Sequence, residues 1–69
     1  MLARNLRKYI DTAVVIRWTD PNYDWRYFRL IGFENGRVWL RGMDAPDGSK
    51  HDGGMFDVTP GEIKTCEPR

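Results

Sequence analysis

The sequence contains few of the residues that build disulfides, structural metal sites or catalytic centres. Its 69 residues include one cysteine, Cys66, and one histidine, His51. A single cysteine excludes an internal disulfide framework, and without a CxxC motif or a Cys/His cluster structural zinc is not expected. The sequence therefore predicts no metal and no cofactor, and a reducing compartment such as the cytoplasm fits it best.

Long hydrophobic runs are also absent. The first ten residues carry Arg4, Arg7 and Lys8 without a continuous apolar stretch, so we expect neither a signal peptide nor a membrane span. The formal net charge of +1 is too small to indicate a nucleic-acid partner by itself. Any prediction of a nucleic-acid partner must therefore rest on how the charges are distributed along the chain.

The residues that are present are typical of one small folded domain. Hydrophobic residues make up 41% and charged residues 30% of the chain, which lies within the globular range. The length allows a single domain over residues 1–69. Three residues each of Trp, Tyr and Phe are many for this size, and aromatic side chains dominate core and interface energetics.

Apolar periodicity predicts a short amphipathic helix within residues 1–11. Five strand-like segments follow, rich in β-branched and aromatic residues, at 13–19, 25–33, 37–43, 55–58 and 63–66. Asn35-Gly36 predicts a hairpin turn, and Gly32 predicts a bulge or bend. Residues 44–54 contain many turn formers and predict a long, exposed, mobile loop. Thr59-Pro60 predicts one helical turn before the last strand.

This order of elements is the plan of a mainly β, five-stranded Sm-like or SH3-like barrel. Val38-Trp39-Leu40, followed by Asp44, the Asp47-Gly48 turn, Phe56 and Ile63, also resembles the WYL domain of bacterial regulators over roughly residues 13–66. The resemblance implies a bacterial or phage barrel that senses a ligand, often nucleic-acid-like, through arginines and aromatic rings on one face.

Strand alternation separates a core from an outer surface. The predicted core residues are Val14, Ile16, Phe28, Leu30, Val38 and Leu40. The opposite face then carries arginine interleaved with aromatic residues, namely Arg17, Trp25, Tyr27, Arg29, Arg37, Trp39 and Arg41. Such a face suits single-stranded nucleic acid, because guanidinium groups pair with phosphates and rings stack on bases.

Three other interpretations of this face remain open. It resembles a protein-binding hot spot, since Trp, Tyr and Arg are enriched there, so a small inhibitor or adaptor is the alternative function. It also suits self-association into a homo-oligomer. Lastly, the arginines can simply pair with acids in neighbouring turns, such as Asp20, Asp24 and Glu34.

No credible catalytic constellation is present, so we expect a binding module and not an enzyme. Ser49, His51 and Asp52 are close in sequence, but triads are assembled on rigid elements and not by adjacency in one loop. The basic residues of the first helix allow two interpretations, a structural lid or an extension of the basic surface.

Overall fold

The computed structural model describes residues 1–69 and contains five strands and three short helical segments. The helical segments are α1 (Ala3–Leu6), η1 (Arg7–Tyr9) and η2 (Pro60–Glu62), the last two being 3-10 helices. The strands are β1 (Thr12–Trp18), β2 (Tyr27–Glu34), β3 (Arg37–Gly42), β4 (Met55–Val58) and β5 (Ile63–Pro68). These elements confirm the predicted mainly β fold class. None of the helices has the length and apolar character needed to cross a bilayer.

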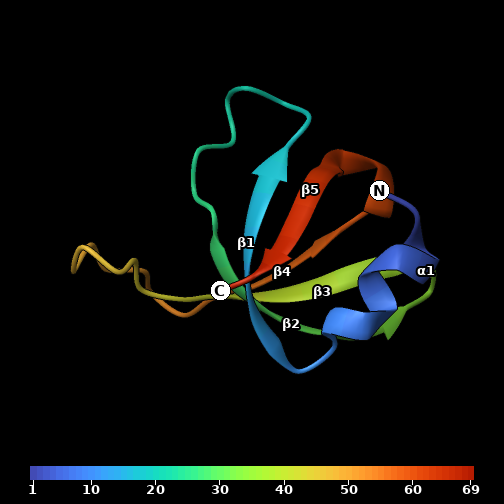
Figure 1. Cartoon of the computed structure of the whole chain (residues 1–69), viewed down its shortest axis with the longest axis horizontal. Helices are drawn as coiled ribbons and strands as arrows, with labels where there is room; N and C mark the ends of the chain where they lie inside the picture. The colour runs from blue at the N-terminus through green and yellow to red at the C-terminus, as the bar shows by residue number, and fades with distance from the viewer.

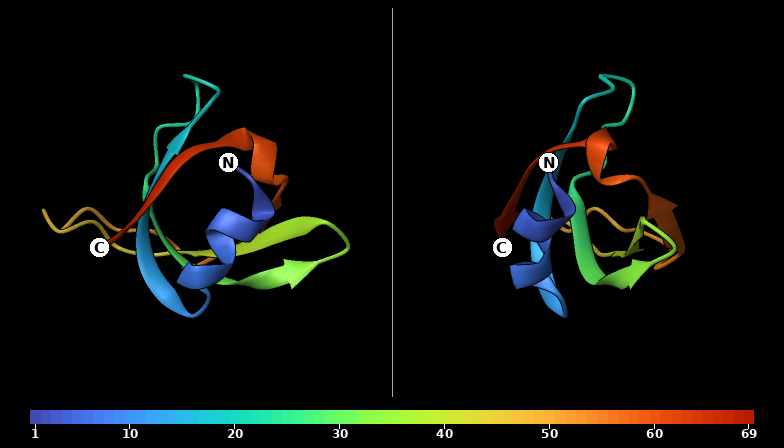
Figure 2. Two further views of the ribbon diagram at one scale, coloured as in Figure 1. Left: turned by 45° about the vertical axis from the view of Figure 1, so that its right-hand side comes forward. Right: turned by 90° about the vertical axis from the view of Figure 1, so that its right-hand side faces the viewer.

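The five strands form one antiparallel sheet in the order β4-β3-β2-β1-β5. Strands β4 and β5 are its two edges, and η2 joins them in sequence. Figures 1 and 2 show the strands curling around a common interior, with α1 lying across one open end. The sheet thus forms a small barrel that stays open between β4 and β5.

The interior is built from alternating residues of the strands, as strand periodicity requires. The six predicted core residues are all buried, which confirms the predicted division of faces. Leu6, Ile63 and Cys66 complete the same buried cluster. Since Leu6 belongs to this cluster, α1 packs on the inner side of the sheet.

A bulge in β2 changes the alternation halfway along the strand. Leu30 lies opposite Leu40, but Gly32 lies opposite Trp39, so Ile31 is an extra residue without a partner. Ile31 is 37% exposed, and Phe33 returns to the inner side opposite Val38. The prediction of a bulge or bend at Gly32 is confirmed.

The turn between β2 and β3 has the predicted hairpin geometry. Asn35 and Gly36 adopt φ angles of 52° and 74°. Both angles lie in the left-handed region that a tight two-residue hairpin of this type requires, and Asn and Gly tolerate it best. This turn sets the register that places Arg37 opposite Glu34.

The beginning of the chain differs from its prediction in detail. The α-helix is only four residues long and continues as the 3-10 turn η1. Asp11 ends this segment with a φ of 63°, and its N–H donates to the carbonyl of Leu30 (2.7 Å). With no capping side chain and so few residues, α1 depends on Leu6 packing into the core.

The segment between β3 and β4 is mostly exposed, as predicted. Short polar side chains close its turns: the N–H of Ser49 donates to Asp47 (2.9 Å) and the N–H of His51 donates to Asp44 (2.9 Å). These bonds favour the charged carboxylates and hold the pKa values of Asp44 and Asp47 below their usual range.

The turn before β5 has the predicted cap. The backbone N–H of Thr59 donates to the Glu62 carboxylate (2.7 Å), and the Thr59 hydroxyl donates to the same oxygen (3.2 Å). Pro60 occupies the first helical position, where its missing N–H removes no hydrogen bond.

Candidate functional site

Six of the seven predicted site residues lie on one side of the sheet, opposite the core. We call this set the outer face: Arg17, Tyr27, Arg29, Arg37, Trp39 and Arg41. Each alternates along its strand with a buried core residue. Arg17 and Arg41 are exposed and the other four are half-buried.

Two arginines of the outer face are directly opposed. Arg29 of β2 pairs with Arg41 of β3 in the ladder. Like charges at such positions destabilise a sheet. Arg29 is partly compensated, because its guanidinium donates to the carbonyl of Asp11 (2.7 Å) and lies 3.5 Å from the Asp11 carboxylate. Arg41 forms no ion pair.

Arg37 is engaged within the chain. Its Nε donates to the Asp57 carboxylate at 2.6 Å, and Nη2 donates to the Asp57 carbonyl at 3.1 Å. Both side chains remain more than 40% exposed, with values of 43% and 44%. Exposed pairs of this kind contribute about 0–1 kcal/mol, so phosphate or carboxylate groups can compete for Arg37.

Trp39 occupies the centre of the outer face. It lies opposite Gly32 on one side and Asp57 on the other. The indole Nε1 is buried and has no hydrogen-bond partner in the chain. Buried indole N–H groups usually find a partner, so this unpaired N–H is unusual.

The structure corrects the assignment of Trp25 to the outer face. Strand β2 begins at Tyr27, so the alternation does not extend back to Trp25. The Trp25 indole packs against the core cluster, and its Nε1 donates to the carbonyls of Tyr27 and Met43, at 3.1 Å each. It therefore belongs to the inner side of the barrel.

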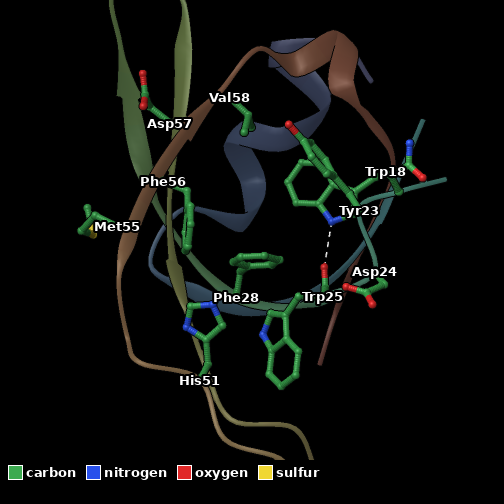
Figure 3. A pocket seen from close by; sticks show the side chains of 11 residues that line it. Trp18, Tyr23, Asp24, Trp25, Phe28, His51, Met55, Phe56, Asp57 and Val58 are labelled. Atoms are coloured by element: carbon green, nitrogen blue, oxygen red, sulfur yellow. Dashed lines mark hydrogen bonds between the residues drawn. The ribbon is translucent and has the colours of Figure 1, made fainter. Parts of the chain in front are cut away.

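Sequence reasoning missed an aromatic cleft on that inner side. The cleft has a volume of about 450 Å³ and lies between the edge strand β4 and the β1–β2 connection. Figure 3 shows the rings that surround it, with Phe28 and Phe56 on two sides. The lining aromatic residues are Trp18, Tyr23, Trp25, Phe28, His51 and Phe56.

His51 reaches the cleft from the loop between β3 and β4. Its ring centroid lies 5.4 Å from that of Trp25 and 5.5 Å from that of Phe56. His51 Nδ1 lies 3.1 Å from the N–H of Gly53 and 3.1 Å from the Asp52 carboxylate, so neighbouring loop residues hold the ring in place. No hydrogen bond joins Ser49 to His51, so the two do not form a nucleophile and base pair.

The basic residues near the start of the chain lie over aromatic rings of the inner side. The guanidinium carbon of Arg7 is 4.8 Å from the centre of the Phe33 ring, and Lys8 Nζ is 5.1 Å from that of Tyr9. This packing favours the interpretation of the helical segment as a structural lid. No group of three or more His, Cys, Asp or Glu side chains is placed to hold a metal ion.

Cys66 is buried in the core opposite Ile16, with 5% of its surface exposed. Burial, helped by the neighbouring Glu67 charge, raises the pKa of its thiol to about 11 from an ordinary value of 9.0. We expect iodoacetamide to modify Cys66 far more slowly at neutral pH in the folded chain than in urea, as measured by mass spectrometry.

The same pKa difference makes stability depend on pH. The unfolded thiol ionises near pH 9.0 and the folded thiol near 11, so the unfolded state releases its proton first. The free energy of unfolding should therefore fall with rising pH across this interval. The free energy of unfolding of Cys66→Ala should fall less over the same pH interval. Equal slopes of this free energy against pH in the two proteins would contradict the raised pKa of Cys66.

Comparison with protein-family models, with curated proteins and with solved structures finds no match to this chain.

Proposed function

We propose that the protein is a non-catalytic binding module whose outer face binds single-stranded nucleic acid in a regulatory or accessory role. The observation that carries the proposal is the direct pairing of Arg29 with Arg41 across β2 and β3. Two arginines at paired positions weaken the sheet locally, and a phosphate bound by both would offset the repulsion between their like charges. Arginine also suits this role by geometry, since its planar fork matches phosphate oxygens.

The neighbouring aromatic residues support the same function. Tyr27 precedes Arg29 by two positions in β2, and Trp39 precedes Arg41 by two positions in β3, so each ring shares a face with one of the paired arginines. Both rings are half-buried and keep part of their surface exposed. Bases stack on such platforms at about 1–3 kcal/mol each, without sequence preference.

In this proposal Arg17, Arg29, Arg37 and Arg41 contact phosphates, while Tyr27 and Trp39 stack on bases. Trp25 is left out because its indole packs on the inner side. The resemblance to WYL domains favours a nucleic-acid-like ligand and a bacterial or phage source, and the single cysteine favours a cytoplasmic location.

A protein partner is the second candidate, and the free edge of β4 favours it. β4 pairs only with β3, so its other edge offers backbone groups to an added strand. Trp39 and Arg41 lie opposite Asp57 and Met55 of this strand, so a docked chain would meet the outer face. Salt dependence separates the two candidates, because phosphate contacts release counterions.

Fluorescence-anisotropy titration of single-stranded and duplex oligonucleotides tests the proposal. We expect salt-sensitive binding of single strands, weakened by Arg41→Ala together with a decrease of about 1 in the slope of log affinity against log salt. Trp39→Ala should weaken binding at all salt concentrations. The matched control is Arg4→Ala, since Arg4 is exposed on α1 at the inner side.

Absence of binding at low salt by the folded protein would overturn the nucleic-acid proposal. Equal losses for Arg41→Ala and Arg4→Ala would mean that net charge, and not the outer face, determines affinity. Light scattering on the same samples measures self-association into a homo-oligomer, which the sequence also allows for the outer face.

A further inference from the structure

We propose that the aromatic cleft binds the quaternary ammonium group of a small molecule. The cleft lies on the inner side of the barrel and shares none of the phosphate-binding residues of the outer face. The inference is therefore independent of the proposed nucleic-acid function.

Three pairs of rings in the cleft meet nearly at right angles. Trp18 and Phe28 have ring centroids 5.6 Å apart with planes inclined at 88°, and Phe28 and Phe56 are 6.2 Å apart at 87°. Tyr23 stands at 86° to Trp18, with centroids 5.4 Å apart. These edge-to-face contacts pack the rings on each other, and Phe28, at 5% exposure, forms the base of the space that Figure 3 shows between Phe28, Phe56 and Trp18. Tyr23 and Phe56 are 51% and 42% exposed and present ring surface to a ligand. Several ring faces around one space are the arrangement that attracts organic cations.

The charges around the cleft are complementary to a cation. The chain has eleven Lys and Arg residues, yet none of them lines the cleft. The charged residues that do line it are Asp24 and Asp57, and Arg37 already pairs with Asp57. Asp24 is exposed beside Tyr23 and Trp25 and forms no ion pair. The lining thus carries acidic side chains and no Lys or Arg, and Figure 3 places Asp24 beside Trp25 at the margin of the cleft.

The hydrogen bonds of the two indoles fix the walls of the cleft. Trp18 Nε1 donates to the carbonyl of Trp25 (2.8 Å), and Trp25 Nε1 donates to the carbonyls of Tyr27 and Met43. Neither indole N–H is left to bind an anion, so these residues offer the ligand only their π systems. Because both rings are held by the backbone, they need little reorganisation on binding.

The size of the cleft favours a free small molecule. Its volume of about 450 Å³ lies in the range of small-molecule pockets, about 300–1,000 Å³. A trimethylammonium group fills only part of this space, which leaves room for the rest of the ligand.

Titration with choline and with its neutral isostere tests the proposal. In the isostere a tert-butyl group replaces the trimethylammonium group, so shape is kept and charge is lost. We expect choline to bind about tenfold more tightly, corresponding to a cation–π contribution of about 1.4 kcal/mol, as followed by tryptophan fluorescence. Equal affinities, or no saturation by choline, would overturn the proposal.

Matched variants locate the site. Phe56 is 42% exposed, so Phe56→Leu should weaken choline binding severalfold without unfolding the chain. Phe33→Leu is the control, because Phe33 lies under Arg7 and does not line the cleft. Similar losses of choline affinity in both variants would contradict the placement of the binding site in the cleft. Tighter binding of a trimethyl-lysine peptide than of choline would overturn the assignment to a free small molecule.

Discussion

Replacing Leu40 by alanine is expected to remove most of the stability of this protein. Leu40 is fully buried in the central part of β3, opposite Leu30 on one side and Phe56 on the other. Truncation of such a residue costs about 2–5 kcal/mol, because apolar contacts are lost and the cavity closes only in part. A chain of 69 residues has a free energy of unfolding on the order of 5 kcal/mol.

Urea denaturation followed by circular dichroism measures this effect. The matched control is Leu2→Ala, because Leu2 is 54% exposed and should change the free energy of unfolding by less than about 0.5 kcal/mol. A loss for Leu40→Ala no larger than for Leu2→Ala would contradict the assignment of the core.

Replacing Gly42 by alanine should release His51 from the aromatic cleft. The imidazole lies so close to the Gly42 backbone that a Cβ atom built there overlaps Nδ1 and Cε1 of the ring. The ring must move, and the loop between β3 and β4 then loses its contact with Trp25 and Phe56. We expect a loss of about 1–3 kcal/mol in the free energy of unfolding.

A double-mutant cycle separates this clash from other strain at Gly42. In a His51→Ala background the obstructing ring is absent, so Gly42→Ala should become nearly neutral. Gly61→Ala is a second control, since a Cβ at Gly61 meets no atom within 4 Å. If Gly42→Ala is equally harmful in both backgrounds, His51 is not the obstacle.

The parts of the fold that the sequence predicts well are those governed by local rules. Asn35-Gly36 specifies a turn that few other pairs tolerate, and Val38 and Leu40 specify a face by period-two alternation. The bulge at Ile31 is less visible, because only the neighbouring Gly32 indicates it. The six outer-face residues follow from the same alternation.

The cleft could not be predicted in this way, because its residues come from distant parts of the chain. Phe56 of β4 and Trp18 of β1 approach each other only after the sheet has curled. One signal for Trp18 was available: it continues the inward series of Val14 and Ile16. The sequence contains no such signal for His51, because residues in a loop do not follow a periodic pattern. Trp25 was misplaced because the start of a strand is the least certain part of such a pattern.

The loop between β3 and β4 has consequences for how this chain can be altered. Its base is closed by a bond from the Gly42 N–H to the Gly54 carbonyl (3.0 Å), and its tip by bonds between Ala45 and Ser49 and between Gly48 and Ala45. The tip therefore satisfies its own backbone without using the barrel. Loop-closure entropy grows slowly, by about 0.6 kcal/mol for each doubling of length. Residues 46–49 are accordingly the position at which an epitope or a fluorescent peptide can be inserted while the outer face and the aromatic cleft keep their geometry.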